Sequence, residues 1–457
     1  MKSERSKTQR QASILVGVLW CLALLSVVVI GVLHTARLDL LVMKNYGDRV
    51  QAHYLALAGI EKAKALLFQD AKDRSRNRKS HTGELHDAPL EFRDVAFGRG
   101  HFRVFRRGRT DEHGGIKYGV SDEESRLNVN SAATNELANL RGMTPDIIAA
   151  IVDWRDADNA VTPGGAEAEY YAALKPASLP RNGPLQSTGE LLMIRGVTRE
   201  AFLGEDSAQA GHFENDEPDE TDNPGAVLED AGWSGLLTVD SSIRNVSASG
   251  EDRVNVQTAD EAALTAVKGI TADIAKAIIS YRGQQQFASL ADLLDVPAVQ
   301  NQAGARGVQT SQSSQSNQSA NQSAATGPKV VSQQLLMDIA DDVTIDSNQR
   351  LVGMINVNSA SLDVLACLPG LNRDLAQAVI SERQSGGFFP NIAWLLKVPG
   401  LTPEIFKQMA PRVSARSETF RILCEGRVDS TGSRRRIEVI VRVGPSAIDT
   451  LSYREGL

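Results

Sequence analysis

The sequence predicts an α+β protein: one long N-terminal helix, then a small antiparallel sheet interrupted by a large inserted α-helical domain. Three observations carry this prediction. An uncharged apolar run near the N-terminus continues into a helical pattern, strand patterns occur at both ends of the remaining chain, and a helical repeat fills the part between them. The 457 residues suffice for two or three domains. The formal net charge of −7 gives no general reason to expect nucleic acid as a partner.

The N-terminal segment predicts a membrane-spanning helix. Residues 12–33 carry no formal charge, and as a helix this run would reach about 30 Å, the thickness of a bilayer's hydrocarbon core. The basic residues before it place the short N-terminus in the cytoplasm and the rest of the chain outside. A cleaved secretory signal is the alternative. Against it, the apolar run is long, and apolar residues recur at three- and four-residue spacing, without proline, to about residue 70.

Strand patterns predict one sheet in two halves, within 71–122 and within 416–445. Four stretches carry the pattern: Phe102–Arg107, Ile116–Val120, Thr419–Arg427 and Arg436–Val443. The last two are joined by Asp-Ser-Thr-Gly-Ser, which is typical of a hairpin turn. A lone two-stranded ribbon is only marginally stable, so all four are expected in one sheet. Residues 446–457 are expected to be a tail.

The region between these halves, 123–415, contains three copies of one pattern. Each copy begins with Asn-Val followed by Asn or Gln, has a glycine 14 residues after the first asparagine, and has an arginine 13 residues after that glycine. The copies occupy 127–204, 254–297 and 355–410. The glycines are Gly142, Gly269 and Gly370, and the arginines are Arg155, Arg282 and Arg383.

Each copy predicts a helix-hairpin-helix unit. A hydroxyl residue is expected to cap a first short helix, which ends at the glycine. These first caps are Ser131, Thr258 and Ser359. A second polar residue is expected to cap the next helix, which presents an apolar face. These second caps are Thr144, Thr271 and Asn372.

The units resemble the helix-hairpin-helix domain of the competence DNA receptor. In DNA-binding versions the turn reads Gly-hydrophobic-Gly, so that bare amides approach a phosphate. Here the second glycine is replaced by the second cap, and an acid follows in the first turn of the next helix. The copy 127–204 has six basic and nine acidic residues, 254–297 has three and five, and 355–415 has five and four. Since DNA affinity needs a basic surface, a structural role is favoured, and a membrane-tethered DNA receptor for uptake is the alternative.

Two segments are predicted to be flexible loops between the repeats. Residues 205–230 contain ten acids and no Lys or Arg, and residues 299–328 are rich in Gln, Ser, Asn, Ala and Gly. Cys367 and Cys424 would be able to pair in an oxidising compartment, but no spacing brings them together. The sequence contains no HExxH, Gly-x-Ser-x-Gly or P-loop pattern, so an enzyme is not expected.

One stretch of the first copy suits a hard cation. It contains Asp156, Asp158 and Asn159, then a glycine-rich turn followed by Glu167 and Glu169. Carboxylate and amide oxygens are the ligands of calcium, and less readily of magnesium. The spacing is not that of an EF-hand. From the residues alone, a cation site and a solvated acidic loop are equally supported.

The N-terminal helix resembles that of the type IV pilin superfamily. There a prepilin peptidase removes a short basic leader at the cytoplasmic face, and the matching residues imply a leader 1–12 and processing between Ala12 and Ser13. The family usually has glycine in place of Ala12. Most members also have a glutamate at the fifth mature position, where this chain has Gly17. That glutamate pairs with a neighbouring subunit's terminal amine, so Gly17 suits a subunit at the end of a filament.

The whole chain resembles the GspK family (general secretion pathway protein K), the large minor pseudopilins of type II secretion systems. The residues that carry this resemblance are Asp153 to Asp158, Gly165-Ala166-Glu167, Tyr170-Tyr171, Asn182 and Pro184. The resemblance implies a non-enzymatic subunit at the tip of the pseudopilus, supporting protein export across the outer membrane. It further implies a single-pass inner-membrane protein with a cytoplasmic N-terminus and a periplasmic head.

The same resemblance implies partners and a metal. The partners are the minor pseudopilins of the I and J classes, the major pseudopilin and the prepilin peptidase, and no nucleic acid is expected. The metal is structural calcium with Asp156, Asp158 and Glu167 as ligands. The domain scheme is then a leader at 1–12, a pilin helix at 13–70, half-sheets at 71–122 and 416–445 around the α-domain 123–415, and the tail at 446–457.

Overall fold

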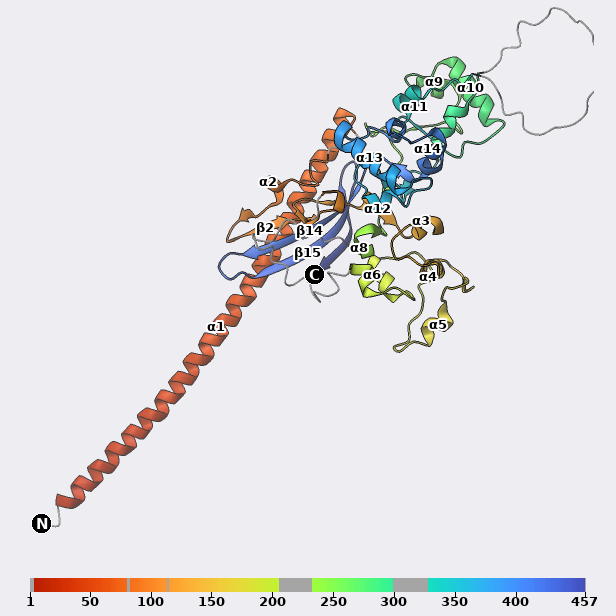
Figure 1. Ribbon diagram of the computed structural model, residues 1–457. Coiled ribbons are helices and arrows are strands. Elements are labelled where there is room, and N and C mark those ends of the chain that lie inside the picture. The colour runs from red at the N-terminus through yellow and green to blue at the C-terminus, as the bar shows by residue number, and fades with distance from the viewer. Residues whose placement is uncertain (1–3, 80–82, 113–114, 205–231, 299–327, 457) are drawn as a thin grey trace, which may run out of the picture.

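The protein is described here from a computed structural model, which describes residues 4–79, 83–112, 115–204, 232–298 and 328–456, with side chains from residue 16 onward. Helix α1 runs from Glu4 to Asn77. Figure 1 shows its N-terminal half projecting from the head and its C-terminal half lying along the sheet. Within the described residues, Val16–Asn77 is long and apolar enough to cross a membrane. The prediction of one long helix, apolar first and amphipathic later, is confirmed.

The C-terminal half of α1 packs on the sheet through one face. Ala56, Ile60, Ala63 and Leu67 are spaced three or four residues apart and are almost fully buried. The helix approaches the strands closely, because a Cβ at Gly59 would lie less than 3.0 Å from the Sγ of Cys424 and from the Phe102 ring. Small residues on the buried face therefore set the distance between helix and sheet.

The sheet has six antiparallel strands in the order β1-β2-β14-β15-β16, with β5 also paired to β14. The strands are β1 Val95–Phe97, β2 Gly100–Val104, β5 Ser121–Asp122, β14 Thr419–Val428, β15 Arg434–Val443 and β16 Ile448–Glu455. Helix α2, Pro89–Phe92, precedes them. Segments on either side of the inserted domain thus form one sheet, and the predicted α+β fold with an interrupted sheet is confirmed.

Two details of the predicted sheet are wrong. The stretch 116–120 does not join it: β4, Ile116–Lys117, pairs only with β3, Arg106–Arg107, in a separate ladder. The expected tail at 446–457 contains β16, an edge strand with seven residues paired to β15. Because β16 is polar and half-exposed along its length, it lacks the apolar alternation that identifies a strand in a sequence.

The inserted α-domain consists of three units, each closed by a two-residue parallel ladder. The ladders pair β6 Leu127–Asn128 with β7 Leu237–Thr238, β9 Val254–Asn255 with β10 Val343–Thr344, and β12 Ile355–Asn356 with β13 Val413–Ser414. A further pair, β8 Ser242–Arg244 with β11 Arg350–Val352, joins the two connections between units. One hydrophobic core runs through all three units.

The helices of the units follow a common order. The first unit contains α3 Thr134–Ala138, α4 Pro145–Arg155, α5 Ala168–Ala172, η3 Thr188–Met193, α6 Arg199–Leu203 and α8 Gly232–Leu236. The second contains α9 Glu261–Ala266, α10 Ala272–Arg282, η4 Leu290–Asp295 and α11 Gln333–Ile339. The third contains α12 Leu362–Leu365, α13 Arg373–Gly386, η5 Ile392–Lys397, α14 Pro403–Met409 and η6 Ala410–Arg412. The helix-hairpin-helix prediction is confirmed.

The ladders correct the predicted limits of the repeats. The units end at residues 238, 344 and 414 rather than at 204, 297 and 410. The segments 205–230 and 299–328 are therefore insertions within the first and second units, not connections between repeats. Apart from residue 328, both predicted loops lie outside the described residues.

The second caps are confirmed, and the first caps are wrong. Thr144, Thr271 and Asn372 each accept a hydrogen bond from the third residue of the following helix. Ser131, Thr258 and Ser359 lie in a turn instead, two residues before the first helix caps. The turn forms because the asparagine that starts each copy accepts the amide of the residue two positions later, at 2.8–3.0 Å.

The repeated arginine holds the same turn in every unit. Arg155, Arg282 and Arg383 each donate to the carbonyl of the valine that follows the starting asparagine. A guanidinium at the end of the second hairpin helix is thereby tied to the start of the unit, which explains the constant spacing of these arginines.

Cys367 and Cys424 are free thiols in different cores. Cys367 lies within the α-domain core, and Cys424 lies between α1 and the sheet. Burial, followed by the charge of Asp363, raises the pKa of the Cys367 thiol to about 12. The suggested disulfide is therefore not formed in this fold.

Candidate functional site

The predicted cation ligands come together at the end of α4. Asp156 is the C-terminal cap of α4, Asp158 follows in the next loop, and Glu167 precedes the first residue of α5. One carboxylate oxygen from each lies within 4.8 Å of the others. Glu167 is only 3% exposed, whereas Asp158 is exposed. The cluster is therefore open to solvent on the side of Asp158 and closed on the side of Glu167.

Several oxygens of this cluster are buried without a hydrogen-bond donor. Among the described residues, both carboxylate oxygens of Glu167 and Oδ1 of Asp156 have no partner. Burial raises the pKa of Asp156, as do the charges of Asp158 and Asp153. Burial also raises the pKa of Glu167, with further contributions from Asp153 and Asp156. Because buried carboxylates are costly without a partner, these oxygens fit a hard cation such as calcium.

The surroundings hold the cluster in place. The side chain of Asn182 donates to the Asp158 carbonyl at 2.6 Å and to Asn159 Oδ1 at 2.9 Å, and its own buried Oδ1 has no donor. Asp153 accepts the amide of Thr162 at 3.1 Å. A Cβ at Gly165 would collide with the Asp153 carboxylate, so the glycine-rich turn is sterically required.

Packed aromatic rings support the same loop. Trp154 and Tyr171 meet edge to face with centroids 5.1 Å apart. The Tyr171 hydroxyl accepts the amide of Arg195 at 3.1 Å, and the Arg195 guanidinium donates to the Gly165 carbonyl at 2.8 Å. These contacts thus join the end of α4, the glycine-rich turn and the start of α5. Trp154, Gly165 and Tyr171 belong to the motif that was recognisable in the sequence.

A second site, which sequence reasoning missed, fastens the α-domain to the sheet. Asp122, Glu123 and Glu124 are consecutive acids at most 2% exposed, the last two in η2, Glu123–Ser125. Asp122 accepts from the side chains of Asn356 at 3.1 Å and Ser417 at 2.5 Å, and also from Ser359. Three adjacent acids directly before the first repeat were the available signal.

The next two acids reach other parts of the chain. Glu123 accepts from Arg421 Nε at 2.7 Å and from the Thr238 hydroxyl. Burial alone would raise the pKa of Glu123, but Arg421, Arg126 and these hydrogen bonds outweigh it and lower the pKa to about 2. Glu124 accepts the amides of Ser242 at 3.1 Å and Thr419 at 3.0 Å. Its pKa is raised, by burial and by the neighbouring Asp122.

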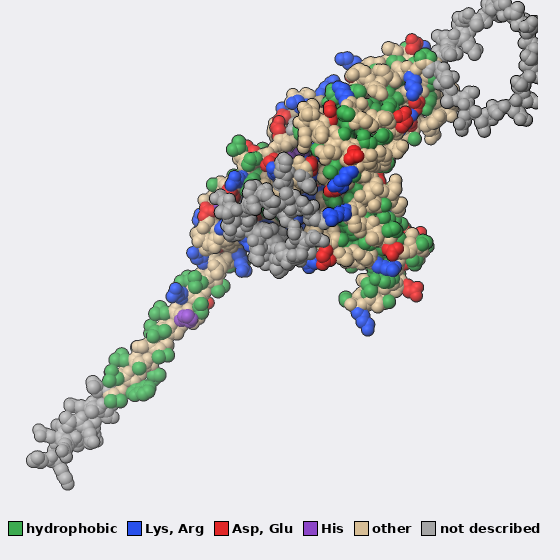
Figure 2. All heavy atoms as spheres, viewed as in Figure 1, with side chains coloured by type: hydrophobic (Ala, Val, Ile, Leu, Met, Phe, Trp, Pro, Cys, Tyr) green, Lys and Arg blue, Asp and Glu red, His purple; other side chains and the backbone are tan. Residues whose placement is uncertain are grey.

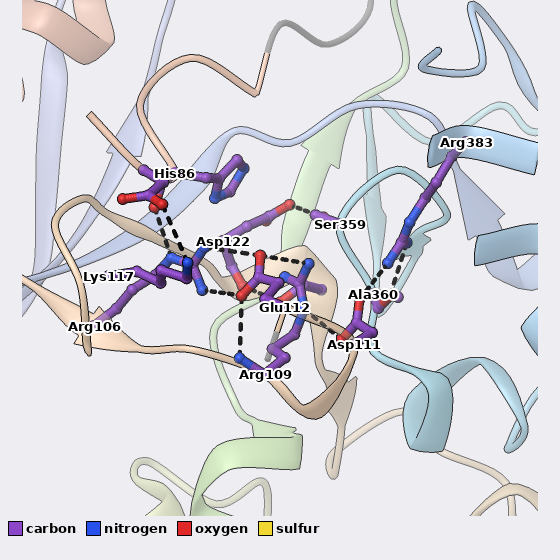
Figure 3. A network of polar contacts seen from close by, with 12 residues as sticks. His86, Arg106, Arg109, Asp111, Glu112, Lys117, Asp122, Ser359, Ala360 and Arg383 are labelled. Carbon is purple, nitrogen blue, oxygen red and sulfur yellow. Dashed lines mark hydrogen bonds and ion pairs between the residues drawn. The ribbon is translucent and has the colours of Figure 1, made fainter. Parts of the chain in front are cut away.

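Figure 3 shows that this junction extends to the third unit. Arg106 makes two hydrogen bonds to Glu112, at 2.7 and 2.9 Å. Asp111, in the adjoining 3-10 turn η1, Thr110–Glu112, accepts from Arg383 at 3.0 Å. Arg383 is the repeated arginine of the third unit, so the loop before the insertion is tied directly to its last unit.

The hairpin turns are packed within the units. A Cβ at Gly269 would lie 3.0 Å from Leu335 of α11, and one at Gly370 would lie 2.9 Å from Gln408 of α14. Capping side chains also occupy the amides at the start of α10 and α13. In the second and third units these amides are therefore capped and covered rather than bare, which does not suit phosphate binding.

Comparisons with known proteins match parts of the chain. Residues 121–203 match the family described as type II secretion system (T2SS), protein K. Residues 249–305 and 352–414 match the helix-hairpin-helix motif family.

Two curated relatives have names that do not refer to secretion. Endonuclease/exonuclease/phosphatase family domain-containing protein 1 of Mus musculus is 25% identical over 36% of this chain and 28% of its own length. S1 RNA-binding domain-containing protein 1 of Homo sapiens is 31% identical over 24% of this chain and 11% of its own. The chain thus spans less than a third of the length of these relatives.

A solved structure also matches over most of the chain. It is the crystal structure of the GspK-GspI-GspJ complex from the type 2 secretion system of enterotoxigenic Escherichia coli, with 13% identity, a TM-score of 0.42, and coverage of 91% of this chain and 99% of that one. The family match at 121–203 begins at β5, where the sheet passes into the α-domain. Residues 121–203, which are inserted in a sheet beside one long apolar helix, are thus similar to a type II secretion protein K domain.

Proposed function

We propose that this chain is a non-enzymatic minor pseudopilin at the tip of the pseudopilus of a type II secretion system, where it supports protein export across the outer membrane. The match of residues 121–203 to the protein K family is the observation that carries this proposal. The described residues around it are engaged in structural contacts, with the buried acids held by hydrogen bonds between the sheet and the units.

The shape of the head supports a position at the end of a filament. Pilin-type helices pack side by side, and Figure 1 shows the α-domain lying beyond and to one side of the sheet. A head enlarged in this way would collide with its neighbours in the shaft but has room at the end. Gly17, which replaces the usual acid of the family, offers no carboxylate to a subunit above it, and a Cβ at this position would meet nothing within 4 Å among the described residues.

The proposed location is the inner membrane, with a cytoplasmic N-terminus and a periplasmic head, until the chain is extracted into the pseudopilus. Figure 2 shows hydrophobic side chains along the projecting part of α1, as a bilayer or neighbouring helices would require. The prepilin peptidase is proposed to cleave between Ala12 and Ser13. The side chains of both residues lie outside the described part of α1.

The proposed partners are the I- and J-class minor pseudopilins and the major pseudopilin. Beyond the membrane segment, α1 still exposes large apolar side chains before it reaches the sheet, namely Leu41, Val42 and Tyr46. Leu41, Val42 and Tyr46 are each at least 48% exposed. Such a surface is costly in water and suits packing against partner helices.

Calcium is the proposed structural cofactor. Asp156, Asp158 and Glu167 would hold it, and the ion would supply positive charge that offsets three neighbouring carboxylates. The ligands lie at the end of α4 and just before α5, so a bound ion would hold these two helix ends together.

Co-purification tests the proposal. The full chain is co-expressed with I- and J-class pseudopilins, extracted in detergent and isolated through a tag on the chain. We expect both partners to co-elute at a constant ratio and not to be displaced by duplex DNA. Failure of both partners to co-elute, under conditions where each is folded, would count against the assignment.

The helix-hairpin-helix matches favour one other candidate, a membrane-tethered DNA receptor for uptake. The first two copies carry net negative charge, which argues against it. The same purified chain distinguishes the two candidates: retention on duplex DNA that falls steeply between about 50 and 200 mM salt would favour the receptor.

A further inference from the structure

A cavity with basic walls lies where the distal end of α1 meets the α-domain. Its volume is about 380 Å³, and it is walled by the end of α1, the loop 246–250 and the segment 416–418. The hydroxyl of Ser75 in α1 donates to the Ser249 carbonyl at 2.7 Å, which fixes one side of the cavity. Asp156, Asp158 and Glu167 do not line this cavity, and the acidic junction meets it only through Ser417, which donates to Asp122.

The wall carries far more positive than negative charge. The cations are Lys72, Arg74, Arg76, Lys79, Arg244 and Arg416, and the acid is Glu418. Glu418 is already engaged: it accepts from Arg244 Nε at 2.7 Å and from Arg350 Nη2 at 3.1 Å. Arg74 is paired with Asp70 at 2.8 Å and Arg76 with Asp73 at 3.8 Å. Among the described residues, Lys72, Lys79 and Arg416 keep a positive charge with no carboxylate within 4.0 Å.

Arg416 is the cation of this wall whose guanidinium is most enclosed by the protein. Its guanidinium donates to the Val246 carbonyl, and no carboxylate among the described residues lies within 4.0 Å of it. Burial, followed by the nearby charge of Arg253, lowers the pKa of Arg416 to about 9. A guanidinium has five N–H donors, so an enclosed one with a single carbonyl acceptor favours an anion beside it.

Two lysines and two hydroxyls provide further donors. Lys79 is exposed, and no carboxylate of the described chain lies within 4.0 Å of its ammonium group. Lys72 lies over the Phe68 ring, 4.3 Å from its centroid. The hydroxyls of Ser247 and Ser249 are 2.8 Å apart in the loop that forms the opposite wall. The wall thus surrounds a small volume with hydrogen-bond donors, which are serine hydroxyls of a loop and the flexible side chains of two lysines.

We propose that this cavity binds a polyvalent oxyanion of the phosphate type, with Arg416 at the inner end and Lys72 and Lys79 at the entrance. A single carboxylate would leave most of the positive charge unmatched, whereas a phosphate group carries close to two charges and several acceptor oxygens. The cavity lies about 55 Å along α1 from Arg37, by the helical rise. While the chain is anchored, this distance favours a phosphate group from solution over a lipid headgroup.

Titration calorimetry of the full chain in detergent, with inorganic pyrophosphate at constant ionic strength and without calcium, tests the site. The double variant Lys72→Gln/Lys79→Gln should bind at least about tenfold more weakly, because two entrance charges are lost. The matched control is Lys268→Gln/Lys276→Gln, which removes two exposed charges from the second unit. It should bind like the unmodified chain. Near-UV circular dichroism checks folding, and Lys79→Gln alone repeats the test if the pair unfolds.

Three outcomes would overturn the proposal, and a further titration identifies the source of the phosphate group. Equal weakening in both double variants, or no heat beyond that of sodium chloride at the same ionic strength, overturns the proposal. Binding of a tetraglutamate peptide but not of pyrophosphate also overturns it, because the chemistry would then be that of carboxylates. A parallel titration with phosphatidylglycerol nanodiscs identifies the source: binding there that the Lys72/Lys79 variant loses supports the same phosphate chemistry supplied by a lipid.

Discussion

At the scale of single residues, the carboxylates at the end of α4 make the clearest chemical prediction. Calcium should raise the unfolding temperature of the full chain, because the ion would offset the buried, unpartnered oxygens of Asp156 and Glu167. Asp158→Ala should remove that rise. Glu169→Ala is the matched control, since Glu169 is an exposed acid in the first turn of α5, two residues after Glu167, and lies outside the cluster. Differential scanning fluorimetry with and without calcium measures the effect. An equal rise in both variants would contradict the ligand assignment.

The buried acid Glu123 makes a pH prediction. Its folded pKa is about 2, below the usual 4.5, so it stabilises the fold above pH 4.5 and loses that contribution as the pH falls toward 2. The contribution is on the order of 3 kcal/mol at neutral pH. Urea unfolding of the full chain at pH 3 to 7 measures it. Glu123→Gln should flatten the acid side of the profile and destabilise the fold, because Arg421 loses the nearer of its two carboxylates and keeps only Glu438, at 3.3 Å. A profile as steep as that of the unmodified chain would contradict this role.

At the scale of elements, the contact between α1 and the sheet depends on Gly59. A methyl group there would lie less than 3.0 Å from Cys424 and Phe102, so Gly59→Ala should destabilise the head by about 1–3 kcal/mol. Gly47→Ala is the matched control in the same helix, because nothing lies within 4 Å of its Cβ position. It should be neutral or slightly stabilising, since alanine favours helix. Urea unfolding compares the two, and equal effects would show that the close approach does not limit packing.

The elements also show how much the sequence could predict. The long helix, the divided sheet and the second hairpin helices follow patterns of period 3.6 or 2 and fixed caps, so they were predictable. The closing ladders were not, because strands of two residues such as Leu237–Thr238 have no periodicity. The first caps were misplaced because the Asn128 side chain forms a local turn, which moves the start of α3 two residues onward.

The site was predictable to a similar extent. Residue type suggested an acidic cation-binding loop, the family resemblance selected Asp156, Asp158 and Glu167 from it, and the structure places one oxygen of each within 4.8 Å of the others. The buried acids 122–124 were missed because their partners Asn356, Ser417 and Arg421 are more than 200 residues away in the chain. Only the folded structure brings these charges together.

At the scale of the whole molecule, the proposed function depends on where the chain sits in a pseudopilus. The head lies beside the distal half of α1, while the proximal half is free to pack with other helices (Figure 1). The acidic junction holds the α-domain to the sheet at Asp122, Glu123 and Glu124, so the enlarged head behaves as one body with the helix. This arrangement supports the proposal that the subunit sits at the end of a helical filament and not within its shaft.

Electron microscopy of isolated pseudopili, labelled with gold through a tag on this chain, tests the position directly. We expect gold label at one end of each filament. The number of gold particles per filament should be small and should not increase with filament length. Label distributed along the shaft in proportion to length would contradict the central claim, because it would show that the enlarged head is accommodated between stacked subunits.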